Sequence, residues 1–263
     1  MMLVINSLLF LQKCHCYSMK KYIPNFVTLL NLFCGSIAVI FAVHNNFVAT
    51  AFFVFLGIFF DFFDGFLARK LGVQSALGIQ LDSLADMVTS GLVPGIVMFN
   101  LLATSADATS QVATVDDWTK SSAFSIGIPL VALIGLGITL ASCYRLAKFN
   151  IDEDQQTYFK GLPTPANALL ILSLPLIVEF QRNSVATNLI LNPYFLIGFT
   201  LLSCYLLNSN IKLFALKFKD YSWANNRLIY ILMIATVVLL VLFQFMAIPL
   251  IILLYILLSL IKT

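Results

Sequence analysis

The chain has 263 residues, of which 60% are hydrophobic and only 10% are charged, and its net charge is +3. A soluble domain keeps about a quarter of its residues charged, so this composition argues against a soluble helix bundle, whose surface it could not cover. A mean hydropathy of +0.97 and apolar blocks of membrane length indicate a polytopic membrane protein, essentially one all-α helical domain.

Residues 1–18 differ from the rest of the chain. They contain an apolar run without a basic segment before it and without a clear small-residue cleavage site, which argues against a secretory signal. The stretch MKKY that begins at Met19 resembles a natural start. We therefore expect an N-terminal extension over 1–18, either interfacial or derived from an upstream start, and a membrane-embedded domain over 19–263.

Apolar windows predict about eight membrane helices. In chain order they lie near 23–43, 47–66, 80–102, 124–147, 166–180, 193–208, 226–243 and 245–261. The fifth and sixth windows are short, so these helices could tilt or be partly re-entrant. Only Gln244 and Phe245 separate the last two windows, which places a turn there.

The distribution of basic residues orients these helices, because cytoplasmic loops carry an excess of Lys and Arg. With a cytoplasmic N-terminus, the outer segments carry only Lys120 and Arg182. The inner segments carry the other basic residues, namely Lys13, Lys20, Lys21, Arg69, Lys70, Arg145, Lys148, Lys160, Lys212, Lys217, Lys219, Arg227 and Lys262. The polar loop 103–123 is then outside, and the basic loop 145–165 is cytoplasmic.

Small residues in the third and fourth windows allow helices to approach closely. They are Gly91 and Gly95 in the third window, and Gly127, Gly135 and Gly137 in the fourth. Two interpretations stay open: packing within the chain, or the face of a homodimer.

Four aspartates lie in one stretch of this apolar chain: Asp61, Asp64, Asp82 and Asp86. A carboxylate at membrane depth is costly unless it is paired, metal-bound or facing water. The first two are three residues apart and the last two are four apart, so each pair shares one face of a helix. The short connection 70–79 makes the two helices antiparallel neighbours, which predicts that all four carboxylates meet in one cleft on the cytoplasmic side.

A divalent cation would remove the repulsion between these carboxylates. Oxygen ligands without histidine favour Mg²⁺, Mn²⁺ or Ca²⁺ over zinc. The alternative is a purely structural set of helix-end carboxylates paired with Arg69 and Lys70.

The residues between the two acidic pairs suggest the substrate. Gly65 and Ala68 follow the first pair, and Gly78 precedes the second by one turn, so a flat ligand could approach the backbone there. Arg69 could bind a phosphate in a bidentate way. A metal, a phosphate-binding arginine and room for a ring indicate an activated nucleotide-lipid substrate.

The order D-x-x-D-G-x-x-A-R-x8-G-x3-D-x3-D is complete in this segment. Its fixed positions are Asp61, Asp64, Gly65, Ala68, Arg69, Gly78, Asp82 and Asp86. The pattern resembles the signature of the CDP-alcohol phosphatidyltransferase family. An earlier stretch, which begins at Pro24 and includes Thr28 and Asn31, is similar to the first helix of that family.

Two later segments narrow the resemblance. The stretch Arg145 to Asn150 and the stretch Gly161 to Asn167 are similar to segments of integral-membrane phosphatidylserine synthases of bacteria and archaea. Many of those enzymes have arginine where this chain has Lys148. The resemblance implies CDP-diacylglycerol as donor, L-serine as acceptor, phosphatidylserine and CMP as products, and a bacterial inner-membrane enzyme with its site toward the cytoplasm.

The resemblance also implies roles for individual residues. Asp61, Asp64 and Asp82 would hold metal ions, and Asp86 would add to metal binding or act as the catalytic base. The nucleotide and phosphates would meet Gly65, Ala68, Arg69 and Gly78, with Thr28 and Asn31 nearby. The acceptor would meet Arg145, Lys148 and Asn150, although the two basic residues could instead be ordinary membrane anchors.

Two other functions remain open. The same chemistry could use glycerol-3-phosphate, inositol or inositol phosphate as acceptor. The four carboxylates could also serve a divalent-cation transporter, but such sites lie near the bilayer midplane, often in repeated helix pairs, and the sequence shows no internal repeat. No nucleic-acid partner is expected.

Overall fold

A computed structural model of the chain describes residues 22–109, 129–151, 158–181, 184–214 and 223–262. The predicted extension 1–18 lies outside these residues. The helices are α2 (Tyr22–Val43), α3 (Phe47–Leu71), α4 (Ala76–Asp86), the π-helix η1 (Met87–Leu92), α5 (Val93–Thr109), the 3₁₀ helix η2 (Leu130–Leu136), α7 (Gly137–Ile151), α8 (Thr164–Phe180), α9 (Ser184–Ile190), α10 (Pro193–Asn208), α11 (Trp223–Phe243), the 3₁₀ turn η3 (Gln244–Met246) and α12 (Ala247–Lys262). The strands are β1 (Tyr158–Lys160) and β2 (Lys212–Phe214).

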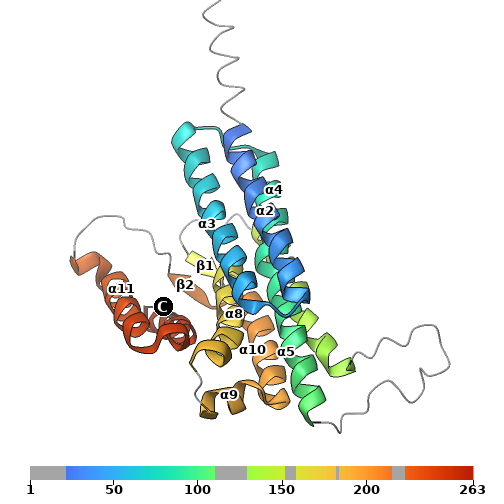
Figure 1. Ribbon diagram of the computed structural model, residues 1–263. Helices are drawn as coiled ribbons and strands as arrows, with labels where there is room; N and C mark the ends of the chain where they lie inside the picture. The colour runs from blue at the N-terminus through green and yellow to red at the C-terminus, as the bar shows by residue number, and fades with distance from the viewer. Residues whose placement is uncertain (1–21, 110–128, 152–157, 182–183, 215–222, 263) are drawn as a thin grey trace, which may run out of the picture.

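Helices α2, α3 and α4 form an upright group at one end of the molecule (Figure 1). Asn46 caps the start of α3, because its side chain accepts a hydrogen bond from the Ala49 N–H. Gly72 ends α3 in the left-handed conformation at φ 63°, which glycine adopts without a steric penalty. Ser75 then caps α4 by accepting from the Gly78 N–H. The connection between the two helices is therefore only four residues long, and it reverses the chain direction.

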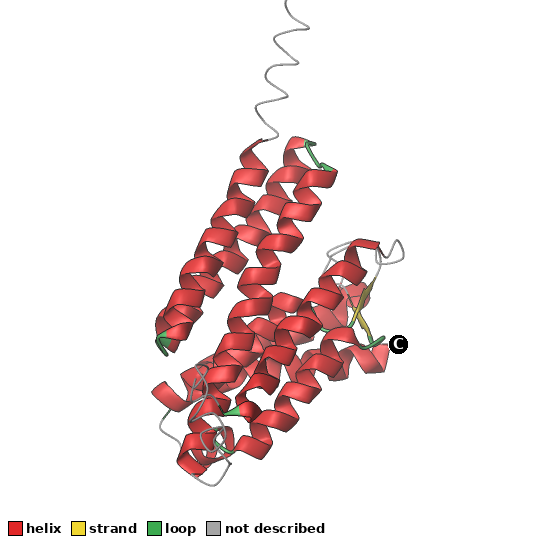
Figure 2. Ribbon diagram, turned by 90° about the vertical axis from the view of Figure 1, so that its right-hand side faces the viewer, coloured by secondary structure: helices red, strands yellow, loops and turns green. Residues whose placement is uncertain are grey.

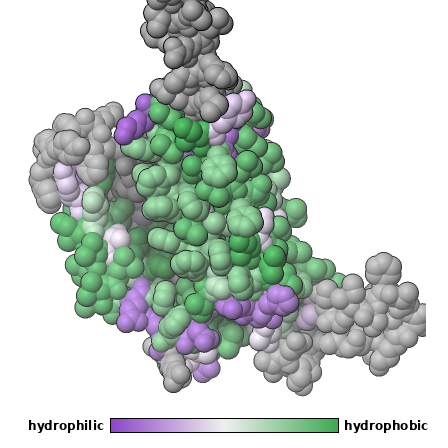
Figure 3. All heavy atoms as spheres, turned by 45° about the horizontal axis from the view of Figure 1, so that its top comes forward, coloured by the Kyte–Doolittle hydropathy of each residue, from purple (hydrophilic) through white to green (hydrophobic). Residues whose placement is uncertain are grey.

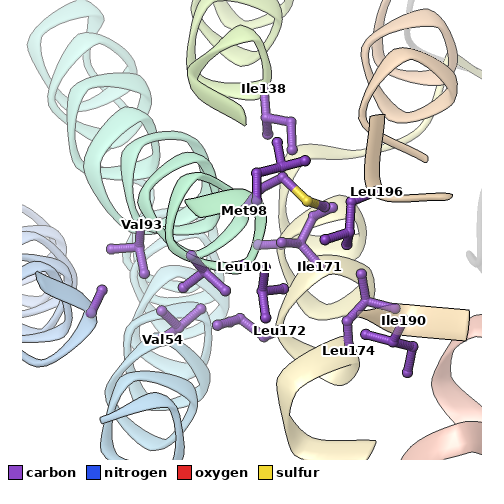
Figure 4. Packing of buried hydrophobic residues seen from close by; sticks show 14 of the residues in the cluster. Val54, Val93, Met98, Leu101, Ile138, Ile171, Leu172, Leu174, Ile190 and Leu196 are labelled. Atoms are coloured by element: carbon purple, nitrogen blue, oxygen red, sulfur yellow. The ribbon is translucent and has the colours of Figure 1, made fainter. Parts of the chain in front are cut away.

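The apolar core lies between α5 and α8, with side chains from α3, α7 and α10 around them (Figure 4). Met98, Leu102 and Ile171 have no exposed surface, and Val54 reaches the same cluster from α3. This core holds the middle of the bundle together. The end of the α2–α3–α4 group that carries the 72–75 turn contributes no residue to it.

The C-terminal helices form an antiparallel hairpin beside the bundle (Figures 1 and 2). Ile229 and Leu232 of α11 pack against Leu254 and Leu258 of α12. The chain reverses at η3, where Gln244 has a φ of 48°, so the predicted turn between the last two windows is confirmed. A short antiparallel ladder joins β1 to β2 and pairs Lys160 with Lys212.

The outer face of the helices is hydrophobic, and hydrophilic residues gather toward the ends (Figure 3). Large apolar side chains are exposed along α3, with Phe52, Phe55 and Phe62 each more than 60% accessible. This pattern suits contact with lipid chains rather than with water. An all-α membrane bundle is therefore confirmed, and the chain is an integral membrane protein.

The predicted number of eight spans is not confirmed. Within the described residues, five helical runs are long and apolar enough to cross a bilayer, or six when the bent pair α9 and α10 counts as one span. The fifth window became α8, which has only 17 residues. The last two windows form one apolar run of 35 residues, from Asn226 to Leu260, that folds back at η3.

Three of the predicted small residues pack within the chain. Gly91 lies against Ser142, Gly95 against Thr139, and Gly135 against the backbone of Phe99. Gly127 lies outside the described residues. At these three positions the structure supports packing of η1 and α5 against η2 and α7, and the homodimer stays a prediction.

The close approach at Gly135 can be tested by adding one methyl group. A Cβ there would lie 2.5 Å from the Phe99 backbone nitrogen, and forcing such an overlap costs about 1–3 kcal/mol. We expect Gly135→Ala to lower the thermal unfolding midpoint in detergent. Gly198→Ala is the control, because its added Cβ would have no atom within 4 Å apart from its own stretch of helix. Equal midpoints for the two variants would contradict the packing.

Candidate active site

Three aspartates converge between α3 and α4. Asp61 and Asp64 come from the second half of α3, and Asp82 comes from α4. One carboxylate oxygen from each lies within 4.8 Å of the others. The structure thus brings together three of the four aspartates that the sequence places in one cleft.

The fourth aspartate, Asp86, lies one turn after Asp82 and is not among the oxygens within 4.8 Å of one another, but it interacts electrostatically with Asp61, Asp64 and Asp82. Its Oδ1 accepts a hydrogen bond from the Asn31 amide nitrogen at 3.3 Å. Asp86 is therefore held from α2, while the other three face one another.

The three-aspartate group has the properties of a cation site. Among the described residues, Asp64 Oδ2 and Asp82 Oδ1 are buried and have no hydrogen-bond partner. An orphaned buried carboxylate oxygen is costly, and a hard divalent cation is the ligand that three such oxygens fit best. This arrangement favours a metal site over helix-end carboxylates paired with Arg69 and Lys70.

A cleft of about 240 Å³ opens beside the group. Its walls come from α2, the 72–75 turn and the facing sides of α3 and α4. They include five of the residues that the resemblance assigns to the nucleotide and phosphates: Thr28, Gly65, Ala68, Arg69 and Gly78. Two of the aspartates, Asp64 and Asp82, also line the cleft. The metal candidates and the nucleotide candidates therefore share one space.

The glycines in this cleft keep it open. The guanidinium of Arg69 lies 3.8 Å from the position that a Cβ at Gly65 would take, so a side chain there would fill the space beside the arginine. A Cβ at Gly78 would lie 3.3 Å from the Asn25 side-chain oxygen. One of the lining side chains is apolar and exposed: Ile79 is 54% exposed.

Asn31 is not among the residues that line the cleft. It has no exposed surface, and it contacts Asp86 and Thr89 instead. The structure therefore places Asn31 beside the acidic cluster rather than beside the nucleotide candidates.

Thr89, a residue that the sequence did not single out, is also fully buried and donates a hydrogen bond to Asn31 at 2.8 Å. A polar residue one turn after Asp86 in an apolar stretch was the signal that could have found it.

The three acceptor candidates lie away from the cleft, on α7. Asn150 exchanges hydrogen bonds with Ser83, which is adjacent to Asp82, so the end of α7 is tied to the acidic helix. Lys148 is exposed and lines a small hollow with Arg145 and Lys160. This hollow is separate from the cleft described above.

Arg145 also has a structural role. Its Nε donates to the Leu162 carbonyl at 2.5 Å, and its Nη2 donates to the Gly161 carbonyl at 3.2 Å. Gly161 has a φ of 72°, and a Cβ there would lie 2.6 Å from the Leu207 carbonyl oxygen. The segment after β1 is thus fixed between Arg145 and the end of α10, which leaves Arg145 fewer free donors than the sequence suggested.

One protein family matches most of this helical region of the chain. The CDP-alcohol phosphatidyltransferase domain matches residues 21–207, from α2 through nearly all of α10. The chain belongs to this family. The predicted enzyme class, a phosphatidyltransferase that uses CDP-diacylglycerol, is therefore confirmed, as is its place in membrane phospholipid synthesis.

Several curated proteins are similar to the chain, and each is named CDP-diacylglycerol–serine O-phosphatidyltransferase. The protein of Bacillus subtilis (strain 168) is 31% identical over 169 residues, which cover 63% of this chain and 79% of that protein. The protein of Methanocaldococcus jannaschii is 31% identical over 177 residues, or 66% and 72% of the two chains. The protein of Helicobacter pylori (strain J99) is 26% identical over 217 residues, or 82% and 80%.

Asp82 allows a direct test of the cation site. We expect Asp82→Asn to abolish CMP release and to weaken Mn²⁺ binding, because the variant loses the charge of a central ligand but keeps its shape. Turnover and calorimetric Mn²⁺ titration of purified protein would measure both. Glu179→Gln, at the exposed end of α8, is the matched control and should behave as wild type. Wild-type rates in Asp82→Asn would remove Asp82 from the site.

Proposed function

We propose that the enzyme transfers the phosphatidyl group of CDP-diacylglycerol to L-serine, with the help of Mg²⁺ or Mn²⁺, or else Ca²⁺. The observation that carries the chemistry is the group of three carboxylates beside a cleft that contains Arg69. The names of the related proteins support serine as the acceptor.

Each part of the donor would meet a different set of residues in the cleft. Arg69 would bind the diphosphate, and Gly65, Ala68 and Gly78 leave room for the cytidine ring. Thr28 on α2 closes the same space from the other side. A cation held by Asp61, Asp64 and Asp82 would neutralise the diphosphate and stabilise the leaving CMP.

The transfer then exchanges one phosphorus–oxygen bond for another. The serine hydroxyl oxygen attacks the phosphatidyl phosphorus, the bond to the bridging oxygen of the diphosphate breaks, and CMP leaves. Asp86, held by Asn31, would align the attacking hydroxyl and accept its proton. Lys148 and Asn150 would receive the serine from the α7 side, with Arg145 fixing the neighbouring segment.

The site would face the cytoplasm of a bacterial inner-membrane protein. Among the described basic residues, Arg69 and Lys70 end α3 beside the cleft, and Lys148 is near the end of α7, which Asn150 ties to α4. These residues belong to the set that the charge bias assigns to the cytoplasmic side. The cleft that Asp64 and Asp82 line extends to the 72–75 turn between the helices, which also argues against a transporter, whose site would lie at the midplane.

An acceptor panel tests the proposal. Purified protein receives CDP-diacylglycerol, Mn²⁺ or Mg²⁺, and one of serine, glycerol-3-phosphate, inositol or inositol phosphate, and CMP release is followed. We expect release with serine and formation of phosphatidylserine. Release with another acceptor alone would replace serine. No release with any acceptor from well-folded protein would refute the proposed reaction.

Lys148 tests the acceptor side. If its ammonium group binds the serine carboxylate, Lys148→Gln should raise the KM for serine about tenfold, which corresponds to the loss of one charge-assisted hydrogen bond. The KM for CDP-diacylglycerol and the thermal midpoint should stay unchanged, since Lys148 is exposed. Lys70→Gln provides a control at another exposed cytoplasmic lysine. An unchanged KM for serine would leave Lys148 as a membrane anchor.

A further inference from the structure

A continuous hydrogen-bonded chain runs from α4 through α2 to the π-helix. Asn31 Nδ2 donates to Asp86 Oδ1 at 3.3 Å, and the Thr89 hydroxyl lies 2.8 Å from Asn31 Oδ1. Asn31 and Thr89 are both completely buried. Neither residue can exchange these partners for water, so each bond constrains the next.

The direction of the bonds follows from the chemistry of the groups. An ionised carboxylate can only accept, so the amide must turn its nitrogen toward Asp86. Its oxygen then faces Thr89, whose hydroxyl must donate. Without that donor, only the Asp86 carboxylate orients the Asn31 amide, and the buried amide oxygen loses its bond to the Thr89 hydroxyl. If the amide were flipped, its oxygen would face the carboxylate, and the two acceptors would repel each other.

The backbone makes room for this threonine at two glycines. A Cβ at Gly57 of α3 would lie 2.7 Å from the Thr89 methyl carbon and 2.9 Å from Asn31 Oδ1, and a Cβ at Gly35 of α2 would also meet the Thr89 side chain. The widened π-helical turn Met87–Leu92 starts directly after Asp86, and such turns often occur at functional sites. The two glycines and the widened helical turn thus both accommodate the Thr89 side chain.

We propose that Thr89 is a positioning residue for the transfer reaction. Its hydroxyl fixes the Asn31 amide, the amide holds one oxygen of Asp86, and the other oxygen stays available to the reacting hydroxyl. This role rests on the proposed function, because it acts through Asp86. A purely structural Thr89 would affect stability instead, and would leave the turnover of the folded enzyme unchanged.

The pair Thr89→Ser and Thr89→Ala isolates the hydroxyl, since both lose the methyl group and only the alanine variant loses the donor. We expect the serine variant to keep kcat within about threefold of wild type and the alanine variant to lose about tenfold or more, as for an unsatisfied buried partner. The KM for CDP-diacylglycerol should change little in both, because Thr89 does not line the cleft.

Thr50 provides the control pair. It is also completely buried in a helix, and its hydroxyl bonds to the Asn46 carbonyl at 2.8 Å at the opposite end of α3. Thr50→Ser and Thr50→Ala should have the same kcat, whatever their thermal midpoints. If Thr89→Ala does not fold, Thr89→Val, which keeps the branched shape, takes its place under the same criterion.

Equal kcat values for folded Thr89→Ser and Thr89→Ala (or Thr89→Val) would overturn the positioning role. A loss that appears only as a lower thermal midpoint would overturn it as well. Both outcomes differ from failure of the proposed function, in which the wild-type enzyme itself releases no CMP with any acceptor.

Discussion

The organisation of this end of the molecule depends on three carboxylates that are forced together inside an apolar bundle. At 4.8 Å, two ionised carboxylates repel by about 3 kcal/mol at an effective dielectric constant of 20. The four-residue turn at Gly72 and the packing of α3 and α4 on α2 maintain this proximity. Part of the folding free energy therefore holds a site that becomes favourable only when a cation or protons neutralise it.

Helix α2 makes the arrangement possible, because it contacts both acidic helices. Its inward face carries Thr28 and Asn31, which are buried. Its outward face carries Phe26 and Phe33, each 62% exposed. The helix thus turns two polar side chains inward and large apolar side chains outward, unlike a helix in a soluble protein. Its inner side contributes to the cleft and supports Asp86.

The sequence was informative wherever the relevant neighbours are close along the chain. The spacing of the aspartates and the short turn before Ser75 predicted the meeting of α3 and α4, and the apolar windows predicted most helices. The number of spans could not be predicted, because hydropathy alone does not decide which of the short or bent helices, such as α8 and the pair α9 and α10, cross the bilayer.

Contacts between distant residues were equally inaccessible to sequence reasoning. Arg145 was expected to meet a substrate, but its donors also hold the carbonyls of Gly161 and Leu162, and periodicity gives no sign of a bond to a backbone oxygen. Asn31 was assigned to the nucleotide from a resemblance, although the structure turns it toward Asp86 and Thr89, 58 residues away in the case of Thr89. Such pairings depend on how the helices pack.

The apolar surface beside the cleft has a kinetic consequence. Because Ile79 lines the cleft and is exposed, and large apolar side chains of α3 are exposed as well, the acyl chains of a lipid donor could remain among the surrounding lipids while its head group enters between α3 and α4. The donor then arrives by lateral diffusion in two dimensions, and the acceptor arrives from water in three. The enzyme would respond to the surface fraction of its lipid substrate rather than to its bulk concentration, so the composition of the membrane itself would set the rate.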